Sequence, residues 1–380
     1  MKSIRIPIQG DRVIWVVVVI LSLFSLLAVY SSTRTLAFSQ GEGGAYYLIR
    51  HLGIFLFGLA LMYIAHLVRY PNYAGLSRFA ILIAIPLLLL TIFKGASINE
   101  AKRWVIIPVI NLSFQTSDFA KLALTMFLAR SITLSQDRIH SWRGGFLPLL
   151  VPIIVICLLI LPANFSTAAI LFASSMVLLY VGRARTRHIM LLAAIGAVML
   201  ILFVGFVSLL PEDRQMRLGT WSERINRYSA GEMDEVYQLR QSKIAIASGG
   251  VVGQMPGNSI QRNYLPNPFS DFIYAIIIEE YGLIGGVIIL LLYLILLYRS
   301  IRISVRSPGT FGALLAVGLG FSLVFQAMIN MAVTTGLLPV TGQPLPLVSM
   351  GGTSIWFTSI SIGIMLSISR ETEQIQDEAQ

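Results

Sequence analysis

The sequence predicts an all-α membrane protein whose chain crosses the bilayer about ten times. Of its 380 residues, 56% are hydrophobic and only 12% are charged, and its mean hydropathy is +0.78. The apolar residues fall in blocks of about 20, the length that a helix needs to cross a bilayer core of roughly 30 Å. A soluble core could not hide so many blocks, so the composition excludes a soluble protein.

The apolar blocks define one transmembrane domain that covers residues 1–380. The first block, from Val13 to Val29, is longer than the apolar region of a signal peptide, and many similar blocks follow it, so we interpret it as a retained helix. We expect helices over residues 13–32, 46–68, 77–93, 114–133, 146–162, 165–181, 188–210, 270–298, 309–334 and 348–369.

The distribution of basic residues predicts that both termini are cytoplasmic. Most Lys and Arg residues near helix ends fall at the termini and in the even-numbered loops, as expected for cytoplasmic segments. The short odd-numbered loops carry only Arg34, Lys94, Lys102 and Arg103. The net charge of +10 is therefore typical of membrane anchoring, and we expect no nucleic-acid partner.

Two polar segments interrupt this pattern. The segment 211–269, between the seventh and eighth helices, is expected to be a large external loop. Gly and Pro residues at 249, 250, 253, 256 and 257 predict ordered turns. A mobile linker is the alternative, although long ordered loops are usually functional. The acidic segment 371–380 is expected to be a short, disordered cytoplasmic tail.

Ionisable residues inside apolar helices are costly, so each is a functional candidate. Asp118 and Lys121 are three residues apart and share one helix face, where they can pair. This pair is equally compatible with a structural role in helix packing and with substrate binding. Glu279 and Glu280 are expected to lie about 12 Å deeper than Asp271 on the same helix. We interpret them as structural polar residues in a buried network.

Asp271 has two interpretations from the residues alone. It is predicted to begin the eighth helix at the external interface, where a carboxylate can cap the helix and interact favourably with its dipole. A carboxylate at that surface can also act as a general base. Taken by itself, the position favours the cap.

The last external loop, 334–354, is rich in Gly and Pro and has no charged residue. Irregular backbone at membrane depth is tolerated only where it is buried in protein or lines a cavity. Its amide groups could bind an anion such as a phosphate, or the segment could be a structural re-entrant turn. The sequence does not decide between these two.

Three motifs follow one another along the chain. The first is Arg103-Trp104 followed by Phe114-Gln115-Thr116-Ser117-Asp118 and Ala120-Lys121, the second runs from Ala245 to Gly285, and the third from Asn330 to Ser354. Together they resemble the SEDS family of cell-wall polymerases, which includes FtsW and RodA. Two departures stand out. The family usually has Pro-Ser-Glu at Thr116-Ser117-Asp118, and often has Glu-Ala-His-Thr at Asn267-Pro268-Phe269-Ser270.

The resemblance implies a peptidoglycan glycosyltransferase of the bacterial inner membrane. Such an enzyme polymerises lipid II into a nascent glycan at the outer leaflet and releases undecaprenyl pyrophosphate. The resemblance implies that Asp271 is the general base or a ligand of a divalent cation, Mg²⁺ or Mn²⁺. The positions that it implies for substrate binding are Arg103, Trp104, Gln115, Asp118, Lys121, Lys243, Gln261, Arg262, Ser349, Gly351 and Gly352. Four of them, Arg103, Lys121, Lys243 and Arg262, are cations suited to pyrophosphate.

Within the family, the opening Gly10-Asp11-Arg12-Val13-Ile14-Trp15 favours a division member at the septum, whereas Pro339-Val340-Thr341-Gly342 is more like the elongation type. The implied partners are a class B penicillin-binding protein with transpeptidase activity and other division proteins. Two rival functions remain. A flippase for lipid-linked precursors would need polar groups through the full membrane depth, and a scaffold would not need Asp271 or Lys121.

Overall fold

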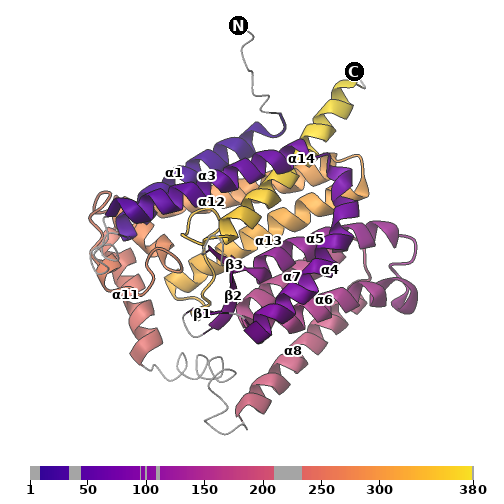
Figure 1. Ribbon diagram of the computed structural model, residues 1–380, viewed down its shortest axis with the longest axis horizontal. Coiled ribbons are helices and arrows are strands. Elements are labelled where there is room, and N and C mark those ends of the chain that lie inside the picture. The colour runs from indigo at the N-terminus through magenta and orange to yellow at the C-terminus, as the bar shows by residue number, and fades with distance from the viewer. Residues whose placement is uncertain are drawn as a thin grey trace.

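The computed structural model describes residues 9–33, 44–94, 96–98, 101–107, 112–208 and 233–378. Nearly all of them belong to one helical bundle (Figure 1). Every range that the sequence predicts to be helical contains a helix, and the described part of the long loop contains α11 and a short 3₁₀ helix. The helices are α1 (Arg12–Ser32), α3 (Gly44–Leu67), α4 (Tyr70–Lys94), α5 (Thr116–Leu134), α6 (Leu147–Ile160), α7 (Phe165–Val181), α8 (Thr186–Ser208), α11 (Met233–Gly249), α12 (Ile273–Arg306), α13 (Thr310–Thr335) and α14 (Ser354–Glu378).

Six segments within the described ranges are long and apolar enough to cross a membrane: Arg12–Ser32, Tyr46–Leu67, Tyr70–Phe93, Trp142–Ile160, Ile273–Arg306 and Thr310–Thr335. Helices α7 and α8 are apolar but shorter by this measure. Helix α5 carries Asp118, Lys121 and Arg130, and α14 is rich in serine and ends in charged residues. The expectation of a multi-pass membrane protein is confirmed.

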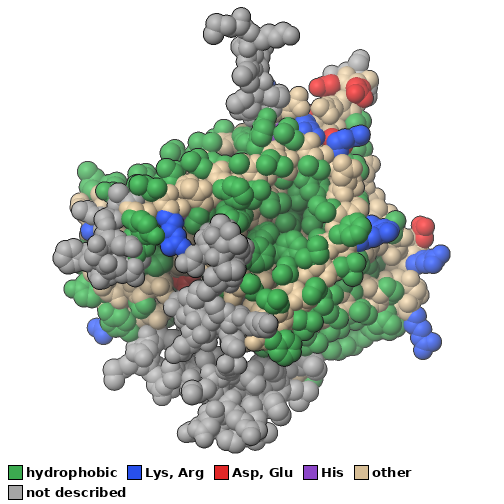
Figure 2. All heavy atoms as spheres, in the orientation of Figure 1, with side chains coloured by type: hydrophobic (Ala, Val, Ile, Leu, Met, Phe, Trp, Pro, Cys, Tyr) green, Lys and Arg blue, Asp and Glu red, His purple; other side chains and the backbone are tan. Residues whose placement is uncertain are grey.

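The bundle has apolar surfaces, and its largely hydrophobic interior also encloses polar and charged side chains. Large apolar side chains such as Val16, Leu23 and Leu82 are exposed on the outer helices, and Figure 2 shows many hydrophobic side chains on the face that it draws. Charged side chains such as Asp118 and Glu279 are instead buried. This distribution is expected of a protein whose solvent is lipid, because polar groups there must find partners inside the protein.

A small antiparallel sheet, with strand order β1-β2-β3, lies between α4 and α5. Its strands are β1 (Ala96–Ile98), β2 (Ala101–Ile107) and β3 (Leu112–Gln115), and Trp104 pairs with Gln115. The sheet corrects the all-α prediction and moves the start of the fourth predicted helix from residue 114 to Thr116. The run of β-branched residues at 105–107 favours an extended strand.

Two further expectations concern the polar segments. Residues 233–269 of the predicted external loop form α11 and an ordered series of turns that includes the short helix Gln261–Asn263; residues 211–232 lie outside the described residues. The predicted disordered tail is wrong for residues 371–378, because α14 remains helical to Glu378. Its last residues are mostly Glu, Gln, Ile and Asp, several of which are good helix formers.

Helix α12 is a hairpin of two arms, 273–281 and 283–306, that meet at Gly282. Gly282 has φ 70° and ψ −175°, a conformation open essentially only to glycine. The Tyr274 hydroxyl donates a hydrogen bond to the Gly286 carbonyl at 3.1 Å. In a straight helix these residues would be about 18 Å apart along the axis, so the first arm folds back along the second.

The hairpin reverses the expected depth of the acidic residues. Ser31, near the end of α1, donates a hydrogen bond to Glu280, so Glu279 and Glu280 lie near the end of the bundle where α1 ends. Asp271 precedes the opposite end of the first arm and therefore lies further into the bundle. The prediction that the two glutamates are the deeper residues is wrong, because it assumed one straight helix.

We predict that Gly282→Ala strongly destabilises the protein. A Cβ atom at Gly282 would lie 2.1 Å from the Val251 carbonyl oxygen, and the backbone conformation alone costs about 1–3 kcal/mol for other residues. Thermal unfolding of the purified protein in detergent measures the effect. The matched control is Gly53→Ala in α3, where a Cβ meets nothing within 4 Å. Equal melting temperatures for the two variants would contradict the prediction.

Candidate functional site

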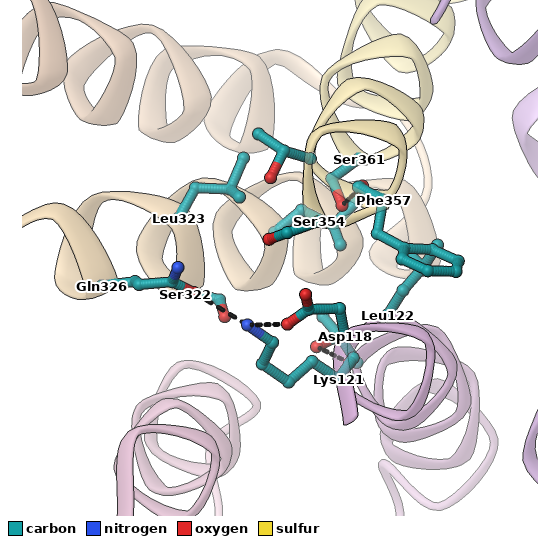
Figure 3. A pocket seen from close by; sticks show the side chains of 12 residues that line it. Asp118, Lys121, Leu122, Ser322, Leu323, Gln326, Ser354, Phe357 and Ser361 are labelled. Atoms are coloured by element: carbon teal, nitrogen blue, oxygen red, sulfur yellow. Dashed lines mark hydrogen bonds and ion pairs between the residues drawn. The ribbon is translucent and has the colours of Figure 1, made fainter. Parts of the chain in front are cut away.

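The two charged residues predicted to pair on the fourth helix do form an ion pair. Lys121 Nζ lies 2.7 Å from Asp118 Oδ1, and only 4% of the Asp118 side chain and 12% of the Lys121 side chain are exposed. Lys121 Nζ also donates to Gln326 Oε1 on α13 at 2.8 Å. The pair thus joins α5 to α13 in the interior of the bundle (Figure 3).

A small pocket of about 30 Å³ lies beside this pair. It lies between α5, α13 and α14, and its lining includes the hydroxyl groups of Ser322, Ser354 and Ser361. The second carboxylate oxygen of Asp118, Oδ2, is buried and has no hydrogen-bond partner within the described ranges. Figure 3 shows it turned toward the α14 side of the pocket. Buried polar atoms of this kind normally bond to water or a ligand, so the pocket can receive a polar group.

Helix α13 carries a row of polar side chains at Gln326, Asn330 and Thr334. Residues four apart lie on one helix face, and this face points at the irregular segments of the protein. Gln326 Nε2 donates to the Pro344 carbonyl at 2.9 Å. Asn330 Nδ2 donates to the carbonyls of Asp271 at 2.9 Å and Gln343 at 2.8 Å. Gln326 and Asn330 therefore connect the ion pair, the Asp271 segment and the last loop.

Asp271 lies in a turn before α12 and is partly exposed. The hydroxyl of Ser270 donates to Asp271 Oδ1 at 2.9 Å. Phe272, not Asp271, occupies the N-cap position of α12, and the Phe272 side chain makes no capping hydrogen bond. Asp271 therefore precedes the cap position by one residue, and the choice between a helix-end role and a general base for its carboxylate stays a prediction.

The last loop holds the Asp271 segment in place. Ser349 Oγ donates to the Ser270 carbonyl at 2.6 Å and accepts from the Leu345 amide at 2.8 Å. The Met350 amide donates to the Phe269 carbonyl at 2.9 Å. Two short chain segments far apart in sequence thus form one unit around Asp271.

Between residues 348 and 351, the backbone amides of the same loop are all engaged and are not available to an anion. The amides of Val348, Ser349, Met350 and Gly351 all donate to backbone carbonyls. Residues 345–349 are also buried. For this part of the loop the structure favours a structural re-entrant turn over an anion site.

The first motif meets the third through β3. The Gln115 amide donates to Thr353 Oγ1 at 3.0 Å, and Thr353 Oγ1 donates to the Ser113 carbonyl at 3.2 Å. This contact places Gln115 beside Gly351 and Gly352, which precede Thr353. Trp104 pairs with Gln115 from β2. Arg103 is also in β2, but its side chain is outside the described residues.

The acidic pair on α12 organises the long loop. The Glu279 carboxylate accepts from Ser259 Oγ at 2.5 Å and from the amides of Ile260 at 3.0 Å and Gln261 at 3.2 Å. The Glu279 carbonyl accepts from the Gln254 amide at 2.9 Å. Glu279 thereby fixes both ends of the segment 254–261.

The predicted loop cations lie apart from the ion pair. Arg262 Nη1 donates to the Gly257 carbonyl at 2.8 Å and to Ser31 Oγ at 3.0 Å, which ties the long loop to α1. Lys243 on α11 is exposed, and its side chain lies against Gly336. Among the described contacts, neither residue joins Asp271 or Lys121.

Sequence reasoning found Asp118, Lys121 and Asp271 but missed Gln326, Asn330 and Gln343. The last of these donates from Nε2 to Thr167 Oγ1 on α7 at 2.7 Å. A signal was present for two of them, because Gln326 and Asn330 are amides one turn apart in an otherwise apolar helix.

We predict that Lys121→Met lowers the free energy of unfolding by about 3–5 kcal/mol, because it leaves the buried Asp118 carboxylate without its counter-ion. The double variant Asp118→Leu/Lys121→Met is expected to recover most of this loss. Arg130→Met, the same type of change further along α5, is the control. Chemical unfolding in detergent measures all three. If Lys121→Met were as stable as the unmodified protein, the ion pair would make no contribution to stability.

Comparison with known proteins assigns the chain to a family. The family model for the cell cycle proteins FtsW, RodA and SpoVE matches residues 11–374. Stage V sporulation protein E of Bacillus subtilis is 33% identical over 364 residues, which cover 95% of this chain and 97% of that protein. The probable peptidoglycan glycosyltransferase FtsW of Haemophilus influenzae is 35% identical over 375 residues, covering 97% and 93%.

Two solved structures share the fold. The first is described as "Structural coordination of polymerization and crosslinking by a peptidoglycan synthase complex". It has a TM-score of 0.77 at 23% identity and covers 96% of this chain and 99% of that chain. The rod shape determining protein RodA of Thermus thermophilus has a TM-score of 0.67 at 22% identity, covering 95% and 97%. The chain therefore belongs to the FtsW/RodA/SpoVE family of cell cycle proteins.

Proposed function

We propose that this protein is a peptidoglycan glycosyltransferase that polymerises lipid II during septal cell-wall synthesis. The observation that carries the proposal is the hydrogen-bonded network that joins the Asp271 segment to the Asp118–Lys121 pair through Asn330 and Gln326. Curated relatives named as probable peptidoglycan glycosyltransferase FtsW, which match over more than nine-tenths of this chain, support it.

In the proposed reaction, the C4 hydroxyl of one lipid II attacks C1 of the growing glycan. The new bond joins O4 to C1, and the bond from C1 to the phosphate oxygen breaks. Asp271 takes the hydroxyl proton as general base. The bonding electrons leave with undecaprenyl pyrophosphate, whose charge a nearby cation stabilises. Lys121 is our first candidate for that cation because it lines the small pocket, and Arg103 is the second.

The position of Asp271 supports the role of base. Asp271 is partly exposed, its backbone carbonyl accepts from Asn330, and the carbonyl of its neighbour Ser270 accepts from Ser349. A fixed backbone in a partly exposed residue suits a group that must approach an acceptor hydroxyl within hydrogen-bond reach.

We predict that Asp271→Asn lowers the rate of glycan formation by at least about 10²-fold, the usual contribution of a general base. Purified protein mixed with lipid II and assayed for glycan chains gives the rate. Ser270→Ala, which keeps the carboxylate and removes only its hydroxyl partner, is the control and is expected to lose far less. An Asp271→Asn protein that folds and polymerises at full rate would rule out the base.

The anion-binding role of Lys121 can be separated from its structural role. The double variant Asp118→Leu/Lys121→Met is expected to be folded and yet to show a much lower rate and a weaker apparent affinity for lipid II. An active double variant would mean that the ion pair serves packing alone.

As an alternative to the role of base, we propose that Asp271 would help to hold a divalent cation, Mg²⁺ or Mn²⁺, which would stabilise the charge of the substrate pyrophosphate. Hard oxygen ligands suit both ions. The described residues gather no group of three or more His, Cys, Asp or Glu side chains that could hold a metal, so Asp271 would need pyrophosphate oxygens to complete the site. Lipid II binding and polymerisation measured with a chelator, then with Mg²⁺ or Mn²⁺ restored, test this proposal.

We propose ten crossings, with both termini in the cytoplasm of a bacterium and the Asp271 site opening to the outer leaflet. Several contacts support this arrangement. Asp11, before α1, pairs with Arg299 near the end of α12 at 2.5 Å, and Gly10 lies against Leu366 and Arg370 of α14. The two chain ends therefore lie at the same end of the bundle. Labelling of single cysteines placed at Asp377 and Met255, in a Cys157→Ser protein, should reach opposite sides of the membrane.

The proposed partners are lipid II, the nascent glycan, a class B penicillin-binding protein and other division proteins. The structural neighbour described as a complex for polymerization and crosslinking supports a cross-linking partner. An elongation role, a flippase without covalent chemistry and a scaffold are the alternatives. Filamentous cells on depletion would indicate division and round cells elongation, while glycan chains from purified protein would exclude both a flippase and a scaffold.

A further inference from the structure

A buried histidine outside the site connects to it through hydrogen bonds. His51 on α3 has no exposed surface, and its Nε2 atom lies 3.0 Å from Ser25 Oγ on α1. Ser25 is equally buried and donates to the Val348 carbonyl in the last loop at 2.9 Å. His51 on α3 and Ser25 on α1 thus form a chain of hydrogen bonds that ends at one carbonyl of that loop.

The roles of the atoms follow from what each can do. A carbonyl only accepts, so the single hydroxyl proton of Ser25 goes to Val348. The remaining partner of Ser25 Oγ must then be a donor, which makes His51 the tautomer with its proton on Nε2. His51 Nδ1 is left buried and without a partner in the described part of the chain. Successive hydrogen bonds in a low-dielectric interior polarise and strengthen one another.

The carbonyl at the end of this chain belongs to a strained turn. Leu347, directly before Val348, has φ 63°, which is unusual for a bulky residue and persists only where the surroundings fix it. Both Leu347 and Val348 are buried. The hydrogen bond from Ser25 is one of the contacts that hold this turn in its conformation.

The turn at Leu347 and Val348 also holds the segment that contains Asp271, the proposed base. Ser349 follows Val348, and its hydroxyl donates to the Ser270 carbonyl, one residue before Asp271. We infer that Ser25 and His51 are positioning residues that hold Asp271 in place through Val348 and Ser349. This inference rests on the proposed function, since it concerns the placement of the proposed base.

Ser25→Ala tests the inference in the full-length protein, in detergent with lipid II. We expect kcat to fall about tenfold with KM within about twofold, because a displacement of up to about 1 Å in a reacting group costs as much as 10²-fold in rate. Hydrogen–deuterium exchange across residues 343–350 is expected to quicken. The melting temperature is expected to fall as well, because the substitution leaves the buried Val348 carbonyl without its donor. The matched control is Ser22→Ala, one turn away on α1, because among the described residues the hydroxyl of Ser22 bonds to Val18 within its own helix.

Variants of His51 give a second, independent measurement. His51→Gln, whose amide nitrogen can donate to Ser25, is expected to stay near the unmodified rate. The leucine of His51→Leu cannot donate a hydrogen bond to Ser25. We expect the kcat of this variant to lie between the values of the unmodified protein and of Ser25→Ala. Unchanged kcat and unchanged hydrogen–deuterium exchange in Ser25→Ala would overturn the inference. A fall in kcat in Ser22→Ala equal to that in Ser25→Ala would overturn it as well. If the unmodified protein made no glycan, the proposed function would fail, and the exchange measurement would still decide whether Ser25 holds the turn.

Discussion

The constraint on which this structure depends is the need to satisfy irregular backbone inside a membrane protein. The last loop and the turn before α12 both lie within the bundle, where a carbonyl without a partner costs several kcal/mol. Side chains from surrounding helices supply the donors. Ser25, Tyr293, Gln326 and Asn330 donate to the carbonyls of Val348, Pro346, Pro344 and Gln343. Each hydrogen bond to a carbonyl also fixes the position of the neighbouring residues. The bonds that stabilise the loop therefore also make the site rigid.

The polar face of α13 has a double role under this constraint. The side-chain amides of Gln326 and Asn330 each form hydrogen bonds with two groups, so each residue connects two parts of the fold. Gln326 accepts from Lys121 and donates to Pro344, and this combination needs a group that both accepts and donates, as an amide does and as neither a carboxylate nor an ammonium could. The choice of residue type therefore follows from the bonds that the position must make.

Much of the fold was predictable from the sequence, and the exceptions have physical causes. Helix positions followed from apolar length, and the Asp118–Lys121 pair from a spacing of three residues. The hairpin in α12 was not predictable in this way, because Gly282 lies within a stretch that is apolar apart from Glu279 and Glu280, and hydropathy carries no information about φ. The sheet was missed because its strands are short. The helical end of α14 was missed because composition alone suggested disorder.

Within the site, reasoning from the residues alone identified the charged groups, and the family resemblance added neutral ones such as Gln115 and Ser349, but Ser25 and His51 were missed. Charge in an apolar helix is conspicuous, whereas Ser25 and His51 matter only through partners that are far away in the sequence. His51 and Ser25 are 26 residues apart, and Ser25 and Val348 are 323 residues apart. No local pattern could connect them, so only the folded chain shows which neutral residues belong to the site.

The hairpin at Gly282 also explains how one helix places Glu279 and Glu280 beside the long loop and Asp271 beside the last loop. The first arm of α12 has Glu279 and Glu280 at one end, where they bind the long loop and α1. Asp271 lies just before its other end, beside the last loop. A straight helix starting at Asp271 would place the glutamates in the apolar middle of the bilayer, where ionisable groups are costly. Folding back at Gly282 keeps these acidic groups among polar partners and brings Asp271 into the bundle, next to the residues that hold it.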